Sequence, residues 1–449
     1  MKKEIIIILS VLVFLNLSSV FIKRNGSSFD LISYAIRIAL YFYVLINLYW
    51  RKYPKIIQNH SFFKLCYVIP LLLLYPLLIS IIETNDYRNS ISWIFPTFFL
   101  FADNLFFMYV GFYSSVVSDE RLNISTIFRN FALLSIIGMT LITVYVVTTY
   151  GNLVGLWSFA KSEGGSYTVF LHAYKNANPY KFAILLPFLF LKKNKYNLLF
   201  VVICIINILI AGKRGPLLGI IISTAFLYLY VWHKRLKIFT YCAYLVLILF
   251  LYIQFFDDNI FQTLIYRLDP TEHYNASADF SFYSSGRDQI WYTILDGFFD
   301  SNIYSQFMGH GTIGAYTYLI AHNAPQNAHN TWLEILFNFG IVGMFIFIYY
   351  YIVLIQICIK MKKSNYKWKS IAIFLVLFNL LSTFYTVTYR AGFAFAGYAN
   401  MLFSYLFGNY LACESLYKGN KNISFVDIVR CYLLKSRKEK RNTISSNTL

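Results

Sequence analysis

A histidine, an asparagine and a glutamate stand close together in the segment AHNTWLEILFNFGIVG, which runs from Ala328 to Gly343. The segment lies where a long polar stretch ends and an apolar run begins. A neutral histidine with a pKa near about 6.5 is suited to accept a proton from a hydroxyl group at neutral pH. His329 is therefore a candidate general base. The alternative is that His329 and Asn330 form a polar cap for the apolar helix that follows.

Glu334 lies about one helical turn into the same apolar run. Burying a carboxylate within a membrane is costly unless it has a partner, so an ionisable residue there indicates a functional site. Glu334 is a second candidate catalytic residue, with a structural hydrogen bond between helices as the alternative. On a helix, His329 would share a face with Leu333, and Glu334 would share the adjacent face with Asn338.

Two cations precede a proline in AGKRGPLLG, which runs from Ala211 to Gly219. Pro216 is suited to the first turn of a helix, and the backbone N–H groups at a helix start attract anions. Arg214 could grip a phosphate through two hydrogen bonds, while Lys213 would act as a point charge. The pair predicts an anion site, and the alternative is a tight basic turn.

Three further arginines are candidate ligands for an anion. Arg287, in YSSGRDQIW, either binds an anion or pairs with an acid such as Asp288. Arg37 lies within an apolar run, where it either extends toward the membrane surface or faces a polar cavity. Arg390, in TVTYRAG, is an interface anchor or a further substrate-binding residue.

No metal or nucleotide site is predicted. GHGTIG (Gly309–Gly314) lacks the Lys-Ser/Thr ending of a phosphate-binding loop. The adjacent acids Asp257 and Asp258 are weak evidence for a cation site, and the six cysteines form no CxxC pair. These motifs therefore give no indication of a metal or cofactor site.

Membrane helices must position these residues. The chain has 449 residues, of which 58% are hydrophobic and only 13% are charged, a balance typical of a polytopic membrane protein. The sequence predicts a single all-α membrane domain over residues 1–449. Its twelve expected spans are 5–22, 31–50, 65–82, 94–117, 127–149, 179–191, 196–211, 216–232, 238–256, 331–359, 370–389 and 393–412.

The charge distribution predicts the orientation of these spans. The net charge is +19, but most Lys and Arg residues fall on one side when the spans alternate from a cytoplasmic N-terminus. This positive-inside pattern disfavours a nucleic-acid partner and makes 413–449 a basic cytoplasmic tail. The long segments 150–178 and 257–330 then lie outside. Within the second, Gln289–Phe299 has the spacing of an amphipathic helix, either on the membrane surface or packed on neighbouring spans.

These motifs, in this order, resemble those of the O-antigen polymerase and O-antigen ligase superfamily of bacterial membrane glycosyltransferases. KRGPLLG and SGRDQIW resemble its two arginine motifs, which places Arg214 and Arg287. GHGTIG resembles its glycine pattern, and AHNTWLEILFNFGIVG resembles its His-Asn signature, which places His329 and Asn330. The family often has a glutamate where this chain has Asn338, four residues after Glu334.

The resemblance implies a GT-C-like fold and a metal-independent, inverting transfer of a glycan from undecaprenyl pyrophosphate. His329 would be the base, and arginines would bind the pyrophosphate. Lipid-linked glycan donor and acceptor, membrane lipid and a chain-length regulator protein are the implied partners, at the outer face of the bacterial inner membrane. A polymerase is the first expectation and a ligase the alternative. A flippase, from another class, needs no large outside loop.

Overall fold

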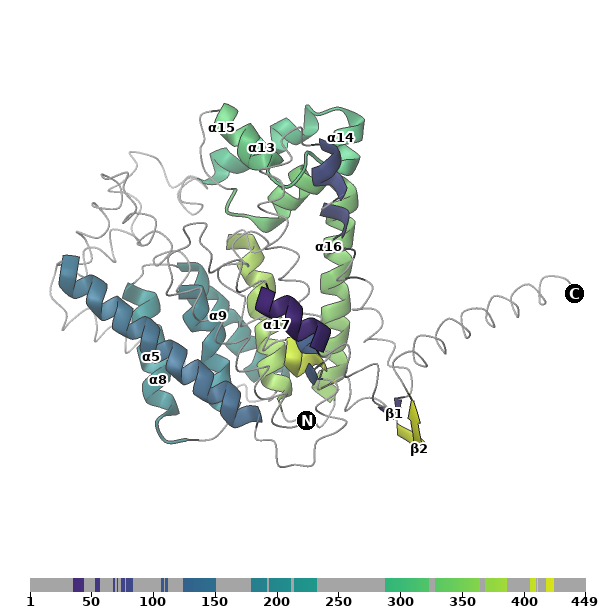
Figure 1. Ribbon diagram of the computed structural model, residues 1–449. Coiled ribbons are helices and arrows are strands. Elements are labelled where there is room, and N and C mark those ends of the chain that lie inside the picture. The colour runs from purple at the N-terminus through teal and green to yellow at the C-terminus, as the bar shows by residue number, and fades with distance from the viewer. Residues whose placement is uncertain are drawn as a thin grey trace, which may run out of the picture.

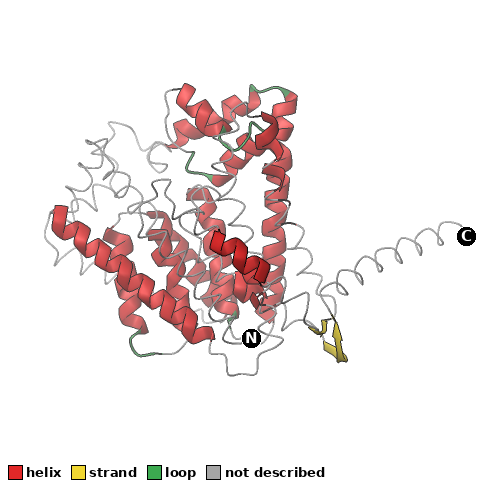
Figure 2. Ribbon diagram, viewed as in Figure 1, coloured by secondary structure: helices red, strands yellow, loops and turns green. Residues whose placement is uncertain are grey.

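The computed structural model shows a mainly helical chain with one short β-ribbon (Figure 1, Figure 2). The structure describes residues 35–43, 53–56, 68, 71, 74–76, 78–83, 106–108, 110–111, 124–150, 179–191, 194–210, 214–231, 287–322, 328–363, 368–385, 404–408, 410 and 417–423. Its named elements are β1 (Tyr53–Ile56), α5 (Ile124–Tyr150), the 3-10 helix η1 (Leu186–Leu191), α8 (Asn197–Ile210), α9 (Arg214–Phe226), the π-helix η2 (Leu227–Val231), α13 (Arg287–Phe299), α14 (Ile303–Met308), α15 (Gly314–Ala321), α16 (Thr331–Lys363), α17 (Lys369–Tyr385) and β2 (Tyr417–Ile423).

The helices form two groups along α16. At one end α13, α14 and α15 pack around the first part of α16, and we call this group, residues 287–322 with 328–339, the cap (Figure 1). The remainder of α16 packs with α17, which also contacts α9, and α5 packs on α8. We call this second group, which includes η1 and η2, the bundle. Of the candidate residues, Arg287, His329, Asn330 and Glu334 therefore lie in the cap.

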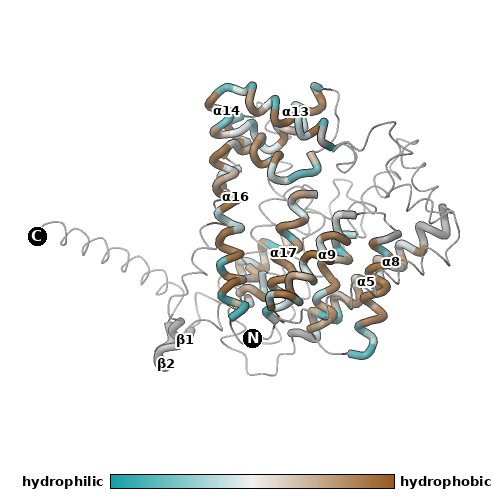
Figure 3. Tube along the Cα trace, turned by 180° about the vertical axis from the view of Figure 1, so that it is seen from behind, coloured by the Kyte–Doolittle hydropathy of each residue, from teal (hydrophilic) through white to brown (hydrophobic). Residues whose placement is uncertain are grey.

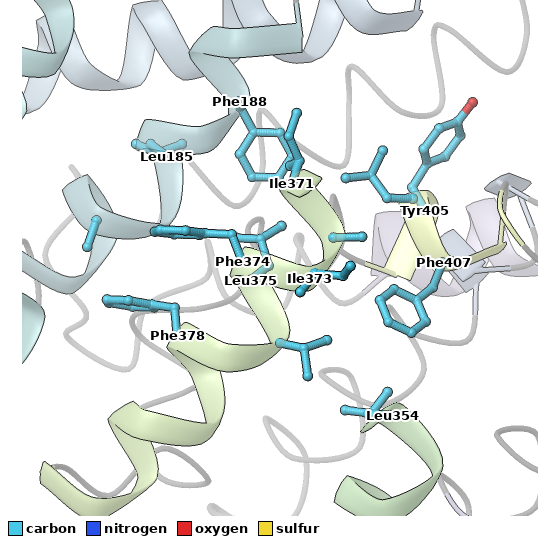
Figure 4. Close-up of a cluster of buried hydrophobic side chains, with 14 of the residues drawn as sticks. Leu185, Phe188, Leu354, Ile371, Ile373, Phe374, Leu375, Phe378, Tyr405 and Phe407 are labelled. Atoms are coloured by element: carbon cyan, nitrogen blue, oxygen red, sulfur yellow. The ribbon is translucent and has the colours of Figure 1, made fainter. Parts of the chain in front are cut away.

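Helix α17 forms the centre of the bundle. Phe374 and Phe378 are buried on it and stack with ring centroids 6.0 Å apart. Figure 4 shows them beside Leu185 and Phe188 of the segment that precedes α8. A Cβ atom on Gly219 of α9 would lie 2.8 Å from Cε2 of Phe378, so the missing side chain allows α9 and α17 to approach closely. Small residues serve this purpose in many membrane helices.

Helix α16 supplies the expected span 331–359, but it is broken. Its 33 residues include Gly340, whose φ of 63° and ψ of −167° are not helical. The part after Gly340 is about 34 Å long at 1.5 Å per residue, which is enough to cross a hydrocarbon core of about 30 Å. It exposes Phe345, Ile352 and Ile359 and ends in lysines. Figure 3 shows this stretch as largely hydrophobic, below a cap of mixed character.

Within the described residues α16 is the one helix long and apolar enough to cross a membrane. Shorter apolar helices coincide with parts of six further predicted spans: Leu74–Glu83, Phe128–Leu141, Pro179–Leu191, Asn197–Ile208, Gly215–Val231 and Lys369–Phe384. Residues 35–43, 106–108 and 404–408 are helical within three more. The predicted spans 5–22 and 238–256, the outside loop 150–178 apart from Tyr150, and most of the tail lie outside the described residues.

A short antiparallel ribbon is the one departure from an all-helical fold in the described residues. Strand β1 pairs with β2, with Tyr53 opposite Ile423 and Ile56 opposite Tyr417, and the register shifts between Pro54 and Ile56. The sequence predicts no strand in either segment. Both segments fall on the cytoplasmic side when the predicted spans alternate, so the pairing agrees with that orientation.

Candidate functional site

Asn330 closes the first turn of α16. Its Oδ1 accepts hydrogen bonds from the backbone N–H groups of Trp332, at 2.9 Å, and Leu333, at 3.3 Å. This is the role of a helix N-cap, which satisfies N–H groups that lack a partner within the helix. The predicted polar cap is therefore confirmed for Asn330. Because α16 begins at Thr331, the prediction that His329 shares a helical face with Leu333 is wrong.

His329 occupies an unusual backbone conformation directly before this cap. Its φ is 53°, in the left-handed region that residues other than glycine rarely adopt, and its side chain is partly buried. Such a conformation costs about 1–3 kcal/mol and persists only where the surroundings enforce it. Strain of this kind is concentrated at functional sites, which agrees with His329 as a candidate site residue.

Ala328 is held from two sides. Its N–H donates to Oε1 of Glu334 at 3.1 Å, and its carbonyl oxygen accepts from Nε1 of Trp291 at 2.7 Å. Ala328 and Glu334 are almost completely buried. The carboxylate of Glu334 thus turns back toward the start of its own helix, while Trp291 reaches across from α13. Both bonds fix the backbone that leads into His329.

Glu334 and Asn338 share a buried face of α16, as predicted, but they hold different segments. The Asn338 side chain donates from Nδ2 to the carbonyl of Thr312 at 3.1 Å, and its Oδ1 accepts from the N–H of Ala315 at 2.7 Å. Asn338 therefore secures the loop before α15, whereas Glu334 secures Ala328. An amide suits this position because it donates and accepts at once, which a carboxylate cannot do.

Arg287 lies near His329 through the geometry of α13. It is the first residue of that helix and is partly buried. Trp291 follows four residues later, and residues four apart share a helical face. Arg287 lies about one turn, some 6 Å along the helix, from Trp291, and the indole of Trp291 contacts the residue directly before His329. The structure thus brings Arg287 and His329 to one corner of the cap.

Arg214 begins a helix that reaches the same level. Helices α9 and α17 run antiparallel, because Gly219 meets Phe378, whereas Tyr230 at the far end lies under Lys362, near the start of α17. Continuing five residues from Gly219 to Arg214 corresponds to moving from Phe378 to about residue 383. There Thr383 accepts a hydrogen bond from Nε1 of Trp332 at 2.7 Å. The start of α9 therefore lies level with the start of α16, and Pro216 falls in its first turn, as predicted.

The other predicted ligands lie elsewhere or outside the described residues. Arg37 belongs to the helical residues 35–43, which Figure 1 shows beside the bundle and apart from the cap. Tyr41 of the same stretch packs on Phe106. The structure does not bring Arg37 close to His329 in the cap. Lys213 and Arg390 are not among the described residues.

The glycine motif binds the cap together through backbone contacts. Gly309 has φ 91°, and a Cβ atom there would lie 2.3 Å from the carbonyl oxygen of Asn338. A Cβ atom on Gly340, at the break in α16, would lie 2.3 Å from the carbonyl oxygen of Phe307. The two glycines thus allow the loop after α14 and the break in α16 to touch. Gly311 adds a hydrogen bond from its N–H to the Asn338 carbonyl at 2.9 Å.

A distant segment, Leu74–Glu83, also secures this loop. Tyr75 donates from its hydroxyl group to the carbonyls of Met308, at 3.2 Å, and Phe339, at 3.1 Å. Ser80 hydrogen-bonds the hydroxyl of Thr312 and accepts from its N–H. These contacts were not predicted from the sequence. Its only signal for this segment was an apolar run, which does not identify a partner more than 200 residues away.

His310 is the second histidine of the cap. Its Nε2 lies 2.9 Å from Oγ of Ser301, and its ring stacks on Phe337 with centroids 4.6 Å apart. Burial lowers the pKa of His310 below its ordinary value, and the negative charge of Glu83 acts in the opposite direction. These contacts belong to the packing of the cap. In the described part of the chain no three His, Cys, Asp or Glu side chains could hold a metal ion, and the expectation of metal-independent chemistry stays a prediction.

Comparison with known protein families finds a match over part of the chain. No curated protein matches the chain significantly. Residues 199–348 match the family model described as O-antigen ligase. The match includes Arg214, Arg287, His329, Asn330 and Glu334, together with the glycine motif, and excludes Arg37 and Arg390. The resemblance found in the sequence motifs is thereby confirmed as a match of residues 199–348 to the family model described as O-antigen ligase.

Proposed function

We propose that the protein is a membrane glycosyltransferase of polysaccharide assembly, and specifically a polymerase. It moves a growing glycan from undecaprenyl pyrophosphate onto the next lipid-linked repeat unit at the outer face of the inner membrane. The observation that carries this proposal is the strained His329 in a cap corner with Arg287, level with the start of α9 at Arg214. The family match over residues 199–348 supports it independently.

The chemistry fits these residue types. A sugar hydroxyl of the acceptor attacks the anomeric carbon of the donor glycan, and its proton passes to a ring nitrogen of His329. The bond between the anomeric carbon and the pyrophosphate oxygen breaks, and the electron pair leaves with the pyrophosphate. Arg287 and Arg214 would stabilise the negative charge that develops there. In this scheme Lys213 and Asn330 assist binding, and Glu334 acts through the backbone rather than on substrate.

A ligase is the second candidate, because the matching family model is described as O-antigen ligase. The donor chemistry would be the same. The acceptor would be a lipid A core rather than a second lipid-linked repeat. Both activities would use a site on the outside of a multi-pass inner membrane protein, and both would leave undecaprenyl pyrophosphate as the product.

The experiment that separates these functions is a profile of lipid-linked glycans in cells that lack the protein. Single repeats accumulating on the carrier at the outer face would support a polymerase. Long chains accumulating on the carrier would support a ligase instead. Repeats retained on the cytoplasmic face would mean a flippase and would contradict the proposal. Complementation with the wild-type chain should restore the normal profile, and complementation with His329→Ala, at equal membrane levels, should not.

A further inference from the structure

The backbone before His329 is held by a clamp that joins two parts of the cap. The left-handed φ of 53° at His329 is unfavourable by itself, so neighbouring contacts must enforce it. On the C-terminal side the Asn330 cap fixes the first turn of α16. On the N-terminal side two hydrogen bonds fix the backbone of Ala328. Its N–H donates to Glu334, and its carbonyl oxygen accepts from Trp291. The conformation of His329 is thus set from both sides.

The hydrogen bond of Trp291 also connects the segment that holds His329 to the helix that begins with Arg287. Ile290, Ile294 and Phe298 of α13 are buried in one cluster with Phe337 of α16, so the two helices pack as a unit. Apolar packing alone fixes the separation of two helices better than the register along them. A single directional hydrogen bond at 2.7 Å, from the residue one turn after Arg287 to the residue before His329, fixes the register at the site itself.

We propose that Trp291 and Glu334 are positioning residues that hold His329 in register with Arg287 for glycosyl transfer. The proposal rests on the proposed function. Neither side chain needs to contact the substrate. Trp291 acts through its indole N–H, and Glu334 acts through a carboxyl oxygen that accepts the Ala328 N–H. Glutamine offers the same acceptor oxygen without the charge, so Glu334→Gln should preserve the clamp whereas Glu334→Leu should remove it.

The chain supplies a matched control for the tryptophan. Trp332 lies at the same end of α16 and also donates its indole N–H at 2.7 Å, but to Thr383 of α17. Its ring packs on Phe347 and Phe384 in the bundle. Trp291→Phe on α13 and Trp332→Phe on α16 therefore make the same chemical change, and both lie near the start of α16. They differ in whether the lost bond lies beside His329 or at the contact with α17.

The test measures kcat and KM of purified variants with a lipid-linked repeat unit, together with thermal unfolding. We expect Trp291→Phe and Glu334→Leu to lower kcat by about 10- to 100-fold with little change in KM, because a displacement of about 1 Å costs on that order. Glu334→Gln should stay within a few-fold of wild type. Trp332→Phe should lower Tm but leave kcat per folded molecule near wild type.

A double variant separates positioning from general destabilisation. If the clamp acts through His329, adding Trp291→Phe to His329→Ala should lower the residual rate no further. Wild-type kcat in Trp291→Phe and Glu334→Leu would overturn the clamp, as would an equal loss of kcat in Trp332→Phe. Wild-type activity in His329→Ala would instead overturn the proposed function, so the two failures are distinguishable. Should Trp291→Phe fail to fold, the contrast between Glu334→Gln and Glu334→Leu still decides the matter.

Discussion

Asn338 shows how one side chain can be matched to both of its contacts. Its amide donates to Thr312 and accepts from Ala315, and it is completely buried. The family that the sequence motifs resemble is expected to have a glutamate at this position. In this chain one contact requires a donor and the other requires an acceptor, so an amide fits this position better than a carboxylate does.

Replacing Asn338 by aspartate should therefore destabilise the cap. Aspartate has the same size, but its carboxylate cannot donate to the Thr312 carbonyl, which would leave two buried acceptors facing each other. We expect a loss of about 1–3 kcal/mol in the free energy of unfolding, measured on purified protein in detergent. Asn302→Asp is the control, because Asn302 caps α14 only as an acceptor for the Ser305 N–H at 2.8 Å. Equal losses in both variants would contradict this account of Asn338.

His310 should make the cap sensitive to acid. Burial lowers its pKa in the folded protein, so the unfolded chain binds the proton more readily. The stability associated with the neutral ring is fully present above the ordinary pKa of about 6.5. It falls as the pH drops through the lowered folded-state pKa. The decrease in Tm between pH 7.5 and pH 5.5 should therefore be smaller in His310→Gln than in the wild type. His322 is exposed, so His322→Gln is the control variant. If Tm of His310→Gln depended on pH as strongly as Tm of the wild type, His310 would not be the source of the acid sensitivity.

At the scale of the elements, hydrophobic spacing predicted the helices of the site well. The pattern of Gln289–Phe299 predicted α13, whose buried residues Ile290, Ile294 and Phe298 are those that the pattern places on one face. The apolar run from residue 331 predicted α16 to its first residue. Both predictions are confirmed because the 3.6-residue repeat and the length of an apolar run can be found within a short stretch of sequence.

The break in α16 and the clamp could not be predicted in this way. A glycine inside an apolar run is also compatible with a continuous helix, and only the Phe307 carbonyl against Gly340 shows why the helix breaks. The bond from Trp291 to Ala328 joins residues 37 positions apart. Local patterns contain no information about which backbone group such a side chain will reach.

Gly340→Ala should uncouple the cap from the membrane-crossing part of α16. A Cβ atom would meet the Phe307 carbonyl at 2.3 Å, and φ of 63° disfavours alanine. The Phe307 carbonyl belongs to the backbone of α14, which cannot shift easily, so we expect a loss of more than about 2 kcal/mol in unfolding free energy. Val342→Ala, two residues on in regular helix, makes a small change without that contact and should cost less. A Gly340→Ala protein as stable as the wild type would show that the close contact is not needed.

At the scale of the whole molecule, the structure and the charge pattern support the same arrangement. The cap belongs to the predicted outside segment 257–330 and the start of α16, while Lys360, Lys362 and Lys363 end the helix on the predicted cytoplasmic side. The β1–β2 pairing joins two further segments predicted to be cytoplasmic. Contacts between distant parts of the chain, such as Tyr75 with Met308, could not be predicted from the sequence, because an apolar run does not indicate which segments pack against it.

Cysteine labelling should reveal this orientation in intact cells. In a background without the six native cysteines, Asp300→Cys at the exposed end of α13 should react with a membrane-impermeant maleimide. Lys363→Cys at the other end of α16 should react only after the cytoplasmic membrane is opened. Labelling of Lys363→Cys in intact cells, or protection of Asp300→Cys, would contradict the placement of the cap outside.

The most direct measurement of the central claim is glycosyl transfer by the purified protein in lipid nanodiscs. The substrate is a lipid-linked repeat unit, and chain growth and released undecaprenyl pyrophosphate are measured together. We predict one carrier released for each new glycosidic bond, and a rate about 10²–10⁴ times lower in His329→Ala at equal folded protein. Chain growth at the wild-type rate in His329→Ala, or growth without release of the carrier, would contradict the account.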